Sequence, residues 1–137
     1  MKDISKLLND REIDFLADLF LARYGFETTG KSYRRVKNAM IALSHDFADV
    51  ETELAEVART DGITVSALVN DIERTISALP RPMHEVFNAH YSATDPTSAT
   101  HVTMPENLSA LDSLKFLAAV FLTIVTINYS KYEYFEY

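Results

Sequence analysis

Apolar residues recur along this chain with the spacing of a helix, and this pattern constrains its fold more than any other feature. Side chains three or four positions apart share one face of a helix. Between 64 and 79 the apolar positions with this spacing are Val65, Leu68, Val69, Ile72, Ile76 and Leu79. Pro80 and Pro82 then end the segment, because proline has no amide hydrogen to donate. A chain built from such segments is expected to fold as packed helices.

The same spacing predicts an all-α fold of about six helices with a central helix-turn-helix. Besides 64–79, the helical segments are 10–24, 32–47, 50–60, 83–91 and one that begins near 108. The first two are expected to bury Ile13, Leu16, Ala17, Phe20 and Tyr24, and Tyr33, Val36, Met40, Leu43 and Phe47. The predicted N-caps are Asp10, Ser32, Asp49 and Thr64, whose side chains can accept from first-turn amides. The β-branched run 122–127 fits either a helix or a strand.

The length and composition indicate one domain that is neither secreted nor embedded in a membrane. The 137 residues suffice for a single buried core over 1–137, with 121–137 as a C-terminal extension that could mediate a homodimer. The chain has no cysteine, as is common in a reducing cytoplasm. The most apolar stretch, 116–127, has 12 residues, whereas a membrane span needs roughly 20. The N-terminus lacks the apolar region of a signal peptide, so we expect a cytoplasmic location.

One motif, from Gly25 to Ser32, spells the P-loop pattern of nucleotide-binding proteins, G-x-x-x-x-G-K-[ST]. A working P-loop needs a β-strand that delivers the loop to the phosphates. The residues before Gly25 have a helical spacing instead, so the match is interpreted as accidental. The four histidines do not have the spacing of a metal site, because His84 and His90 are six positions apart. We therefore expect no enzyme activity, no cofactor and no bound metal.

The charges divide into a basic and an acidic region, although the chain as a whole carries a net charge of −7. Residues 23–37 contain five bases and one acid, and several of the bases crowd the start of the second helix. Residues 51–74 contain six acids and two bases. Arginines beside a helix N-terminus favour a negatively charged partner such as a phosphate backbone. The phosphate-contacting candidates are Lys31, Tyr33, Arg34, Arg35 and Lys37.

Residues 54–76 have the pattern of a helix-turn-helix. Ala58 allows the two helices to approach each other, Gly62 suits the turn, and Leu68 can pack the second helix on the first. The second helix would then present its outer side to double-stranded DNA. The base-reading candidates are Ser66, Asn70 and Arg74, since asparagine pairs with adenine and arginine with guanine.

An alternative function uses the acidic region. Glutamates repel phosphate, and an acidic face suits a basic protein partner, such as the DNA channel of a nucleic-acid enzyme. A regulator or inhibitor of this kind, of the sort that a phage or mobile element encodes, would keep the same scaffold without reading DNA. The candidates for this face are Glu53, Glu56, Asp61 and Glu73.

Two segments resemble the C-terminal effector domain of the master response regulator of sporulation initiation in endospore-forming Firmicutes. The first runs from Gly25-Phe26 through Lys31-Ser32-Tyr33 and Val36-Lys37 to Ala39-Met40. The second runs from Val57-Ala58-Arg59 through Thr64-Val65-Ser66 to Ile72 and Ile76. With a further likeness from Pro105 to Val120, the resemblance covers about residues 10–120.

The resemblance implies a six-helix DNA-binding domain of a transcription regulator, whose second hairpin helix enters the major groove. The chain departs from the family in two respects. It has no phosphate-accepting receiver domain, so control by phosphorylation would be absent or supplied in trans. The family carries arginines on the recognition helix, where this chain has Ala67, Asn70 and Glu73, with Arg74 the only base nearby.

Overall fold

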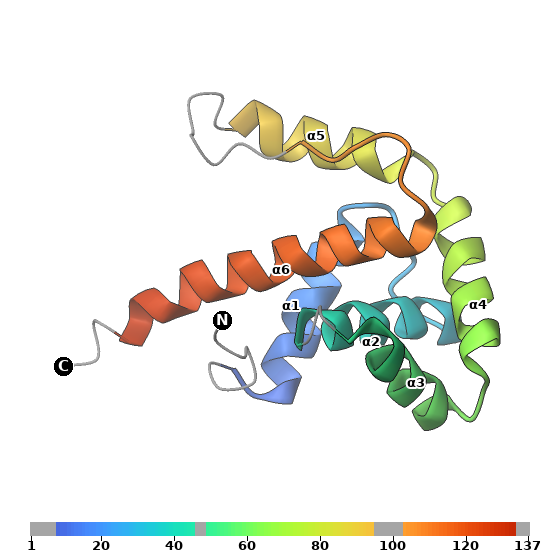
Figure 1. The fold of residues 1–137 in the computed structure, drawn as a ribbon. Helices are drawn as coiled ribbons and strands as arrows, with labels where there is room; N and C mark the ends of the chain where they lie inside the picture. The colour runs from blue at the N-terminus through green and yellow to red at the C-terminus, as the bar shows by residue number, and fades with distance from the viewer. Residues whose placement is uncertain (1–7, 46–48, 95–102, 134–137) are drawn as a thin grey trace.

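The computed structural model describes residues 8–45, 49–94 and 103–133, with side chains for 8–45, 49–90 and 103–126. Across these ranges the protein is all-helical, as the sequence predicts, and contains no strand. Its helices, shown in Figure 1, are α1 (Asp10–Ala22), α2 (Lys31–His45), α3 (Val50–Asp61), α4 (Val65–Ser77), α5 (Met83–Thr94) and α6 (Ala110–Glu133). The order and approximate bounds agree with the apolar spacing.

Helix α2 lies at the centre of the fold and packs against α1, α3, α4 and α6. Four of the side chains that it contributes to the core are fully buried, namely Val36, Ala39, Met40 and Leu43. Figure 1 shows α6 running across the molecule, with α5 on one side of it and α1 to α3 on the other. Phe121 of α6 packs against Phe20 of α1, with ring centroids 5.6 Å apart. The predicted Phe47 lies outside the described residues.

Two predicted N-caps are confirmed and two are wrong. Asp49 accepts a hydrogen bond from the amide of Thr52 at 3.2 Å, and Thr64 Oγ1 accepts one from the amide of Ala67 at 3.1 Å. The cap of α1 is Asn9 rather than Asp10. Ser32 lies inside the first turn of α2, where its hydroxyl donates to Asp71 at 2.9 Å instead of capping the helix.

The capping box of α1 explains why Asn9 starts this helix. Asn9 Oδ1 accepts from the amide of Glu12 at 2.9 Å, and the amide of Asn9 donates to Glu12 Oε1 at 3.2 Å. This reciprocal pair needs a glutamate three positions after the cap, and only Asn9 has one. Asp10 is instead an acidic residue in the first turn, where the helix dipole favours it.

The β-branched run 122–127 is helical, so the strand alternative is excluded for these residues. Leu122 and Val125 are buried, because α6 lies over α2 and α4 in the core. Packing therefore outweighs the local preference of Ile and Val for a strand. Among the helices of the described part of the chain, none is both long and apolar enough to cross a bilayer.

Gly25 follows the end of α1 and packs against Pro80 in the turn after α4. Its φ is +91°, and a Cβ at this position would lie 2.8 Å from Pro80 Cγ. Gly30, before α2, has a similar φ of +93° but nothing within 4 Å of the corresponding position. A Cβ would therefore cause backbone strain at both glycines, but steric overlap only at Gly25.

We predict that Gly25→Ala is more destabilising than Gly30→Ala. The positive φ alone costs about 1–2 kcal/mol for a residue with a Cβ, and overlap with Pro80 adds about 1–3 kcal/mol. The free energy of unfolding, measured in urea, should fall by the first amount in Gly30→Ala and by the sum in Gly25→Ala. Equal losses of unfolding free energy in the two variants would show that Pro80 moves aside with no loss of stability.

Candidate nucleic-acid interface

The inner face of α4 anchors this helix to the rest of the molecule. Leu68 and Ile72 are fully buried, and α4 packs against α2, α3 and α6. The turn before α4 begins at Gly62, whose left-handed conformation (φ 69°) ends α3 and whose amide donates hydrogen bonds to the carbonyls of Ala58 and Arg59. Only three residues, 62–64, separate α3 from α4, so the direction of the second helix is set closely by the first.

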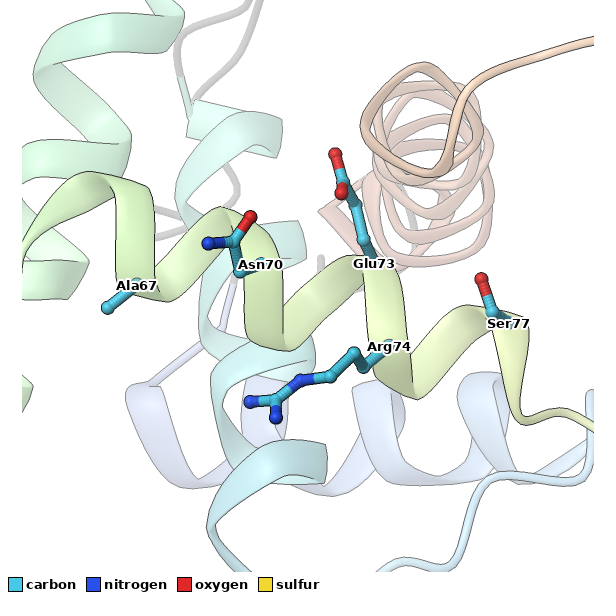
Figure 2. Close-up of a pocket in the computed structure, with 5 residues that line it drawn as sticks. All are labelled: Ala67, Asn70, Glu73, Arg74 and Ser77. Carbon is cyan, nitrogen blue, oxygen red and sulfur yellow. The ribbon is translucent and has the colours of Figure 1, made fainter.

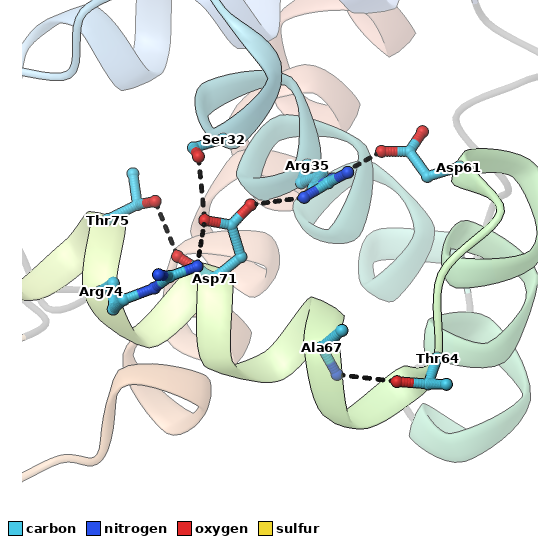
Figure 3. A network of polar contacts seen from close by, with 8 residues as sticks. All are labelled: Ser32, Arg35, Asp61, Thr64, Ala67, Asp71, Arg74 and Thr75. Atoms are coloured by element: carbon cyan, nitrogen blue, oxygen red, sulfur yellow. Dashed lines mark hydrogen bonds and ion pairs between the residues drawn. The ribbon is translucent and has the colours of Figure 1, made fainter.

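A buried charge cluster also anchors α4. The Asp71 side chain, 7% exposed, accepts from Arg35 Nη1 of α2 at 2.8 Å and from Ser32 Oγ at 2.9 Å. The Nε of Arg35 also donates to Asp61, the last residue of α3, at 2.7 Å. Figure 3 shows the Arg35 guanidinium between these two carboxylates. One α2 side chain thus fixes both the end of α3 and the middle of α4.

The surroundings of Asp71 favour its charged form. Burial raises the pKa of the Asp71 carboxyl, but the hydrogen bonds from Arg35 and Ser32 and the charges of Arg35 and Arg74 outweigh burial. The pKa therefore lies below its ordinary value. The same carboxylates raise the pKa of the Arg35 guanidinium, chiefly through its hydrogen bonds to Asp61 and Asp71. Asp71 and Arg35 are accordingly both charged near neutral pH.

Acid should weaken the fold through Asp71. A carboxyl whose pKa is lower in the folded state stabilises the protein above its unfolded pKa of about 3.9. That contribution is lost as the pH falls from about 5 through 4 to the folded pKa. We predict that the free energy of unfolding, measured in urea, falls less between pH 5 and pH 3 in Asp71→Asn than in the wild type. In the exposed control Asp112→Asn it should fall as much as in the wild type. An unchanged slope in Asp71→Asn would contradict the role of the cluster.

The outer face of α4 is exposed and polar. Its side chains line an open hollow of about 650 Å³, shown in Figure 2, and are Ala67, Asn70, Glu73, Arg74 and Ser77. The predicted base-reading residues Ser66, Asn70 and Arg74 are all exposed on this helix. In Figure 2 the Arg74 guanidinium extends back along α4 beneath Asn70. These two side chains lie one helical turn apart, so they share one face.

The five predicted phosphate contacts divide into two groups. Lys31 and Arg34 are exposed in the first turn of α2, and neither forms an ion pair among the described side chains. Arg35 is occupied by Asp61 and Asp71. Tyr33 and Lys37 are buried, so these two do not lie on the phosphate-facing surface that the sequence predicted.

Tyr33 and Lys37 instead hold α2 against α1. The Tyr33 hydroxyl donates to Asp18, and Lys37 Nζ lies 2.8 Å from Asp14 and 3.1 Å from Asp18. Burial, followed by the hydrogen bond to Asp18, raises the pKa of Tyr33. Burial lowers the pKa of Lys37, but its bonds to the two aspartates outweigh burial and raise it. Both residues therefore stabilise the packing of α2 against α1.

The predicted acidic face is also partly used within the fold. Asp61 is bound to Arg35, and Glu56 pairs with Arg59 on the surface of α3. Glu53 is half-buried. Glu73 is exposed on the outer face of α4 and forms no ion pair with any side chain that the structure describes. Of the four acidic candidates, Glu73 is therefore the one whose carboxylate is best placed to pair with a basic partner.

Residues 25–32 match the P-loop sequence pattern but do not have the structure of a P-loop. Residues 25–30 connect α1 to α2, so a helix stands where the phosphate-binding loop needs a strand. Among the side chains of 8–45, 49–90 and 103–126, no group of three histidine or acidic residues has the arrangement of a metal site.

The pairing of Arg35 with Asp71 was not predicted from the sequence. The signal for Asp71 was present, because it follows Leu68 by three positions and precedes Ile72, which places a carboxylate on the apolar face of α4. A charge on such a face needs a buried partner. The partner could not be named, since Arg35 lies 36 positions away.

Comparison with models of protein families, with curated proteins and with solved structures found no match to this chain.

Proposed function

We propose that this protein binds double-stranded DNA as a transcription regulator, with α3 and α4 acting as a helix-turn-helix. The observation that carries the proposal is the pair of Asn70 and Arg74 on the exposed face of a helix that is rigidly anchored on its other side. Asparagine can bond adenine, and arginine guanine, at their major-groove edges. The neighbouring Ser66, Ala67 and Ser77 are small, so α4 can approach the bases closely.

Phosphate contacts would come from the start of α2. Lys31 and Arg34 are exposed there, whereas Arg35 is held by the α3–α4 cluster. Because two bases supply few phosphate contacts and the chain carries a net charge of −7, the affinity should be modest, and it should decrease with salt with a shallow logarithmic slope of about −2. The resemblance to sporulation regulators supports the same interface. It also implies a cytoplasmic regulator.

The proposal is tested by fluorescence anisotropy of the whole chain with mixed-sequence duplex DNA at about 50 mM salt. We expect binding whose affinity decreases linearly with salt on logarithmic axes. Lys31→Ala and Arg34→Ala should each reduce the slope by about one and weaken all duplexes alike. The control Lys115→Ala, on α6, should leave the slope unchanged. Absence of duplex binding by the folded wild-type chain at low salt would refute the proposal.

A second candidate function is supported by Glu73. This exposed carboxylate lies beside Arg74, where it would repel a phosphate backbone, but it suits a basic protein partner. In that case the protein is a regulator or inhibitor of a nucleic-acid enzyme and does not bind duplex DNA. Glu73→Lys would then abolish capture of the partner, whereas Arg34→Ala would leave it unchanged.

A regulator that binds DNA through one α4 helix per chain would gain specificity from a dimer, because two copies contact two half-sites. The segment proposed for this contact is 121–137, of which the structure describes the helical part to Glu133. Analytical ultracentrifugation of the full chain and of a chain ending at Glu133 would show whether the last four residues contribute.

A further inference from the structure

Asp71 contacts the outer face of α4 as well as its inner face. Its Oδ2 accepts from Arg35, and its Oδ1 accepts from Ser32 at 2.9 Å. The same Oδ1 lies 3.5 Å from Nη2 of Arg74, one turn further along the helix. Figure 3 shows the carboxylate between the α2 donors and the Arg74 guanidinium. The Asp71 side chain therefore bonds both to α2 and to a base-reading candidate.

The two ends of the Asp71–Arg74 pair differ greatly in exposure. The Asp71 side chain is 7% exposed, and that of Arg74 is 78% exposed. The carboxylate is held in place by Arg35 and Ser32, so it cannot turn to follow a moving arginine. The arginine is the mobile partner, and its long side chain has many rotamers when nothing restrains it. A fixed carboxylate beside its guanidinium restricts these rotamers before DNA arrives.

We infer that Asp71 is a positioning residue that orients Arg74 for a guanine in the major groove. This inference rests on the proposed DNA-binding function. Guanine presents two acceptors, O6 and N7, that match two parallel N–H groups of an arginine. An arginine held in one orientation before binding loses less entropy when it forms that pair, and it fits a competing base less well. Asp71 should thus contribute to selectivity for guanine without touching the DNA.

A purely structural role for Asp71 predicts a different result. If Asp71 only holds α4 in place, its loss weakens binding to every duplex, and the ratio between duplexes stays constant. If it orients Arg74, its loss lowers the preference for guanine at one position and does so only when Arg74 is present. The ratio of Kd values for duplexes that differ in that one base pair separates the two roles.

The experiment begins with selection of a preferred duplex from a random pool by the wild-type chain. The base pair whose preference is lost in Arg74→Ala marks the position that Arg74 contacts. We then compare Asp71→Asn, Arg74→Ala, the double variant and Ser32→Ala on duplexes with and without guanine at that position. Far-UV circular dichroism and the Tm are recorded for each variant.

We expect Asp71→Asn to reduce the guanine preference at least threefold and to have no effect on that preference in the Arg74→Ala background. Ser32→Ala removes a donor to the same carboxylate but leaves the Arg74 contact, so it should keep the preference. Full preference in a folded Asp71→Asn variant, whether or not it binds both duplexes more weakly by the same factor, would overturn the inference while leaving DNA binding intact. No binding by the wild-type chain would instead refute the proposed function.

A second pair of variants keeps the test valid if Asp71→Asn does not fold. Arg35→Met with Asp71→Leu removes both members of this pair, so no buried carboxylate of α4 is left without its cation, and the more exposed Asp61 loses Arg35 in the double and the single variant alike. It is compared with Arg35→Met alone, which retains Asp71 beside Arg74. The double variant should have at least a threefold lower guanine preference than the single variant. Equal preferences would overturn the inference.

Discussion

Replacing Glu73 with lysine is expected to tighten binding to duplex DNA about tenfold at low salt. Glu73 is exposed on the outer face of α4, next to Arg74, and has no ion-pair partner among the side chains described. The substitution removes a charge that repels the phosphate backbone and supplies a cation at the same place. A new phosphate contact should also make the salt dependence steeper by about one.

The matched control for this prediction is Glu85→Lys. Glu85 is exposed in the first turn of α5, so the substitution changes the net charge equally but away from α4. Anisotropy titrations of both variants at several salt concentrations separate a local effect from a general one. A Glu73→Lys variant that binds DNA no better than Glu85→Lys would place the DNA surface elsewhere. Loss of protein-partner capture in Glu73→Lys would favour the second candidate function.

Ile72→Ala is expected to lower the free energy of unfolding by about 2–5 kcal/mol. Ile72 is fully buried on the inner face of α4, adjacent to Asp71, and its loss leaves a cavity where this helix packs on the core. Because a cavity beneath α4 also loosens its position, DNA affinity should decrease as well.

Ile76→Ala is the control, since Ile76 lies one turn further along α4 but is only half-buried. It should cost about 1 kcal/mol, because part of its side chain already contacts water. Urea unfolding of the two variants at pH 7 gives the comparison. If Ile76→Ala were as destabilising as Ile72→Ala, α4 would not be anchored at the turn that carries Asp71.

The parts of the fold that could be predicted from the sequence are those that depend on residues close together in the chain, such as helix positions and N-caps. Apolar spacing located the helices, and Thr64 and Asp49 each sit where their side chains can cap a helix. Adjacent Asn9 and Asp10 are both good caps, and only the position of Glu12 distinguishes them. The run 122–127 could not be assigned, because its strand preference is overridden by the burial of Leu122 and Val125 in a core that the sequence does not display.

The candidate site was less accessible to prediction, since its geometry depends on contacts between distant parts of the chain. The bases at 31–37 indicate a basic face, yet one of them, Lys37, turns toward acids on α1, as does the neighbouring Tyr33. Arg35 turns toward Asp61 and Asp71, which lie 26 and 36 positions away. Which cations remain exposed therefore depends on how the helices pack. The exposed face of α4, by contrast, follows directly from helical spacing.

The claim that α4 contacts DNA through its outer face is tested most directly by NMR. Amide chemical shifts of the ¹⁵N-labelled chain are followed while a duplex of mixed sequence is added at low salt. We expect the largest changes at the amides of Ser66, Asn70 and Arg74, with smaller changes at Lys31 and Arg34. Saturating changes confined to α1, α5 or α6, with the α4 amides unmoved, would contradict the claim.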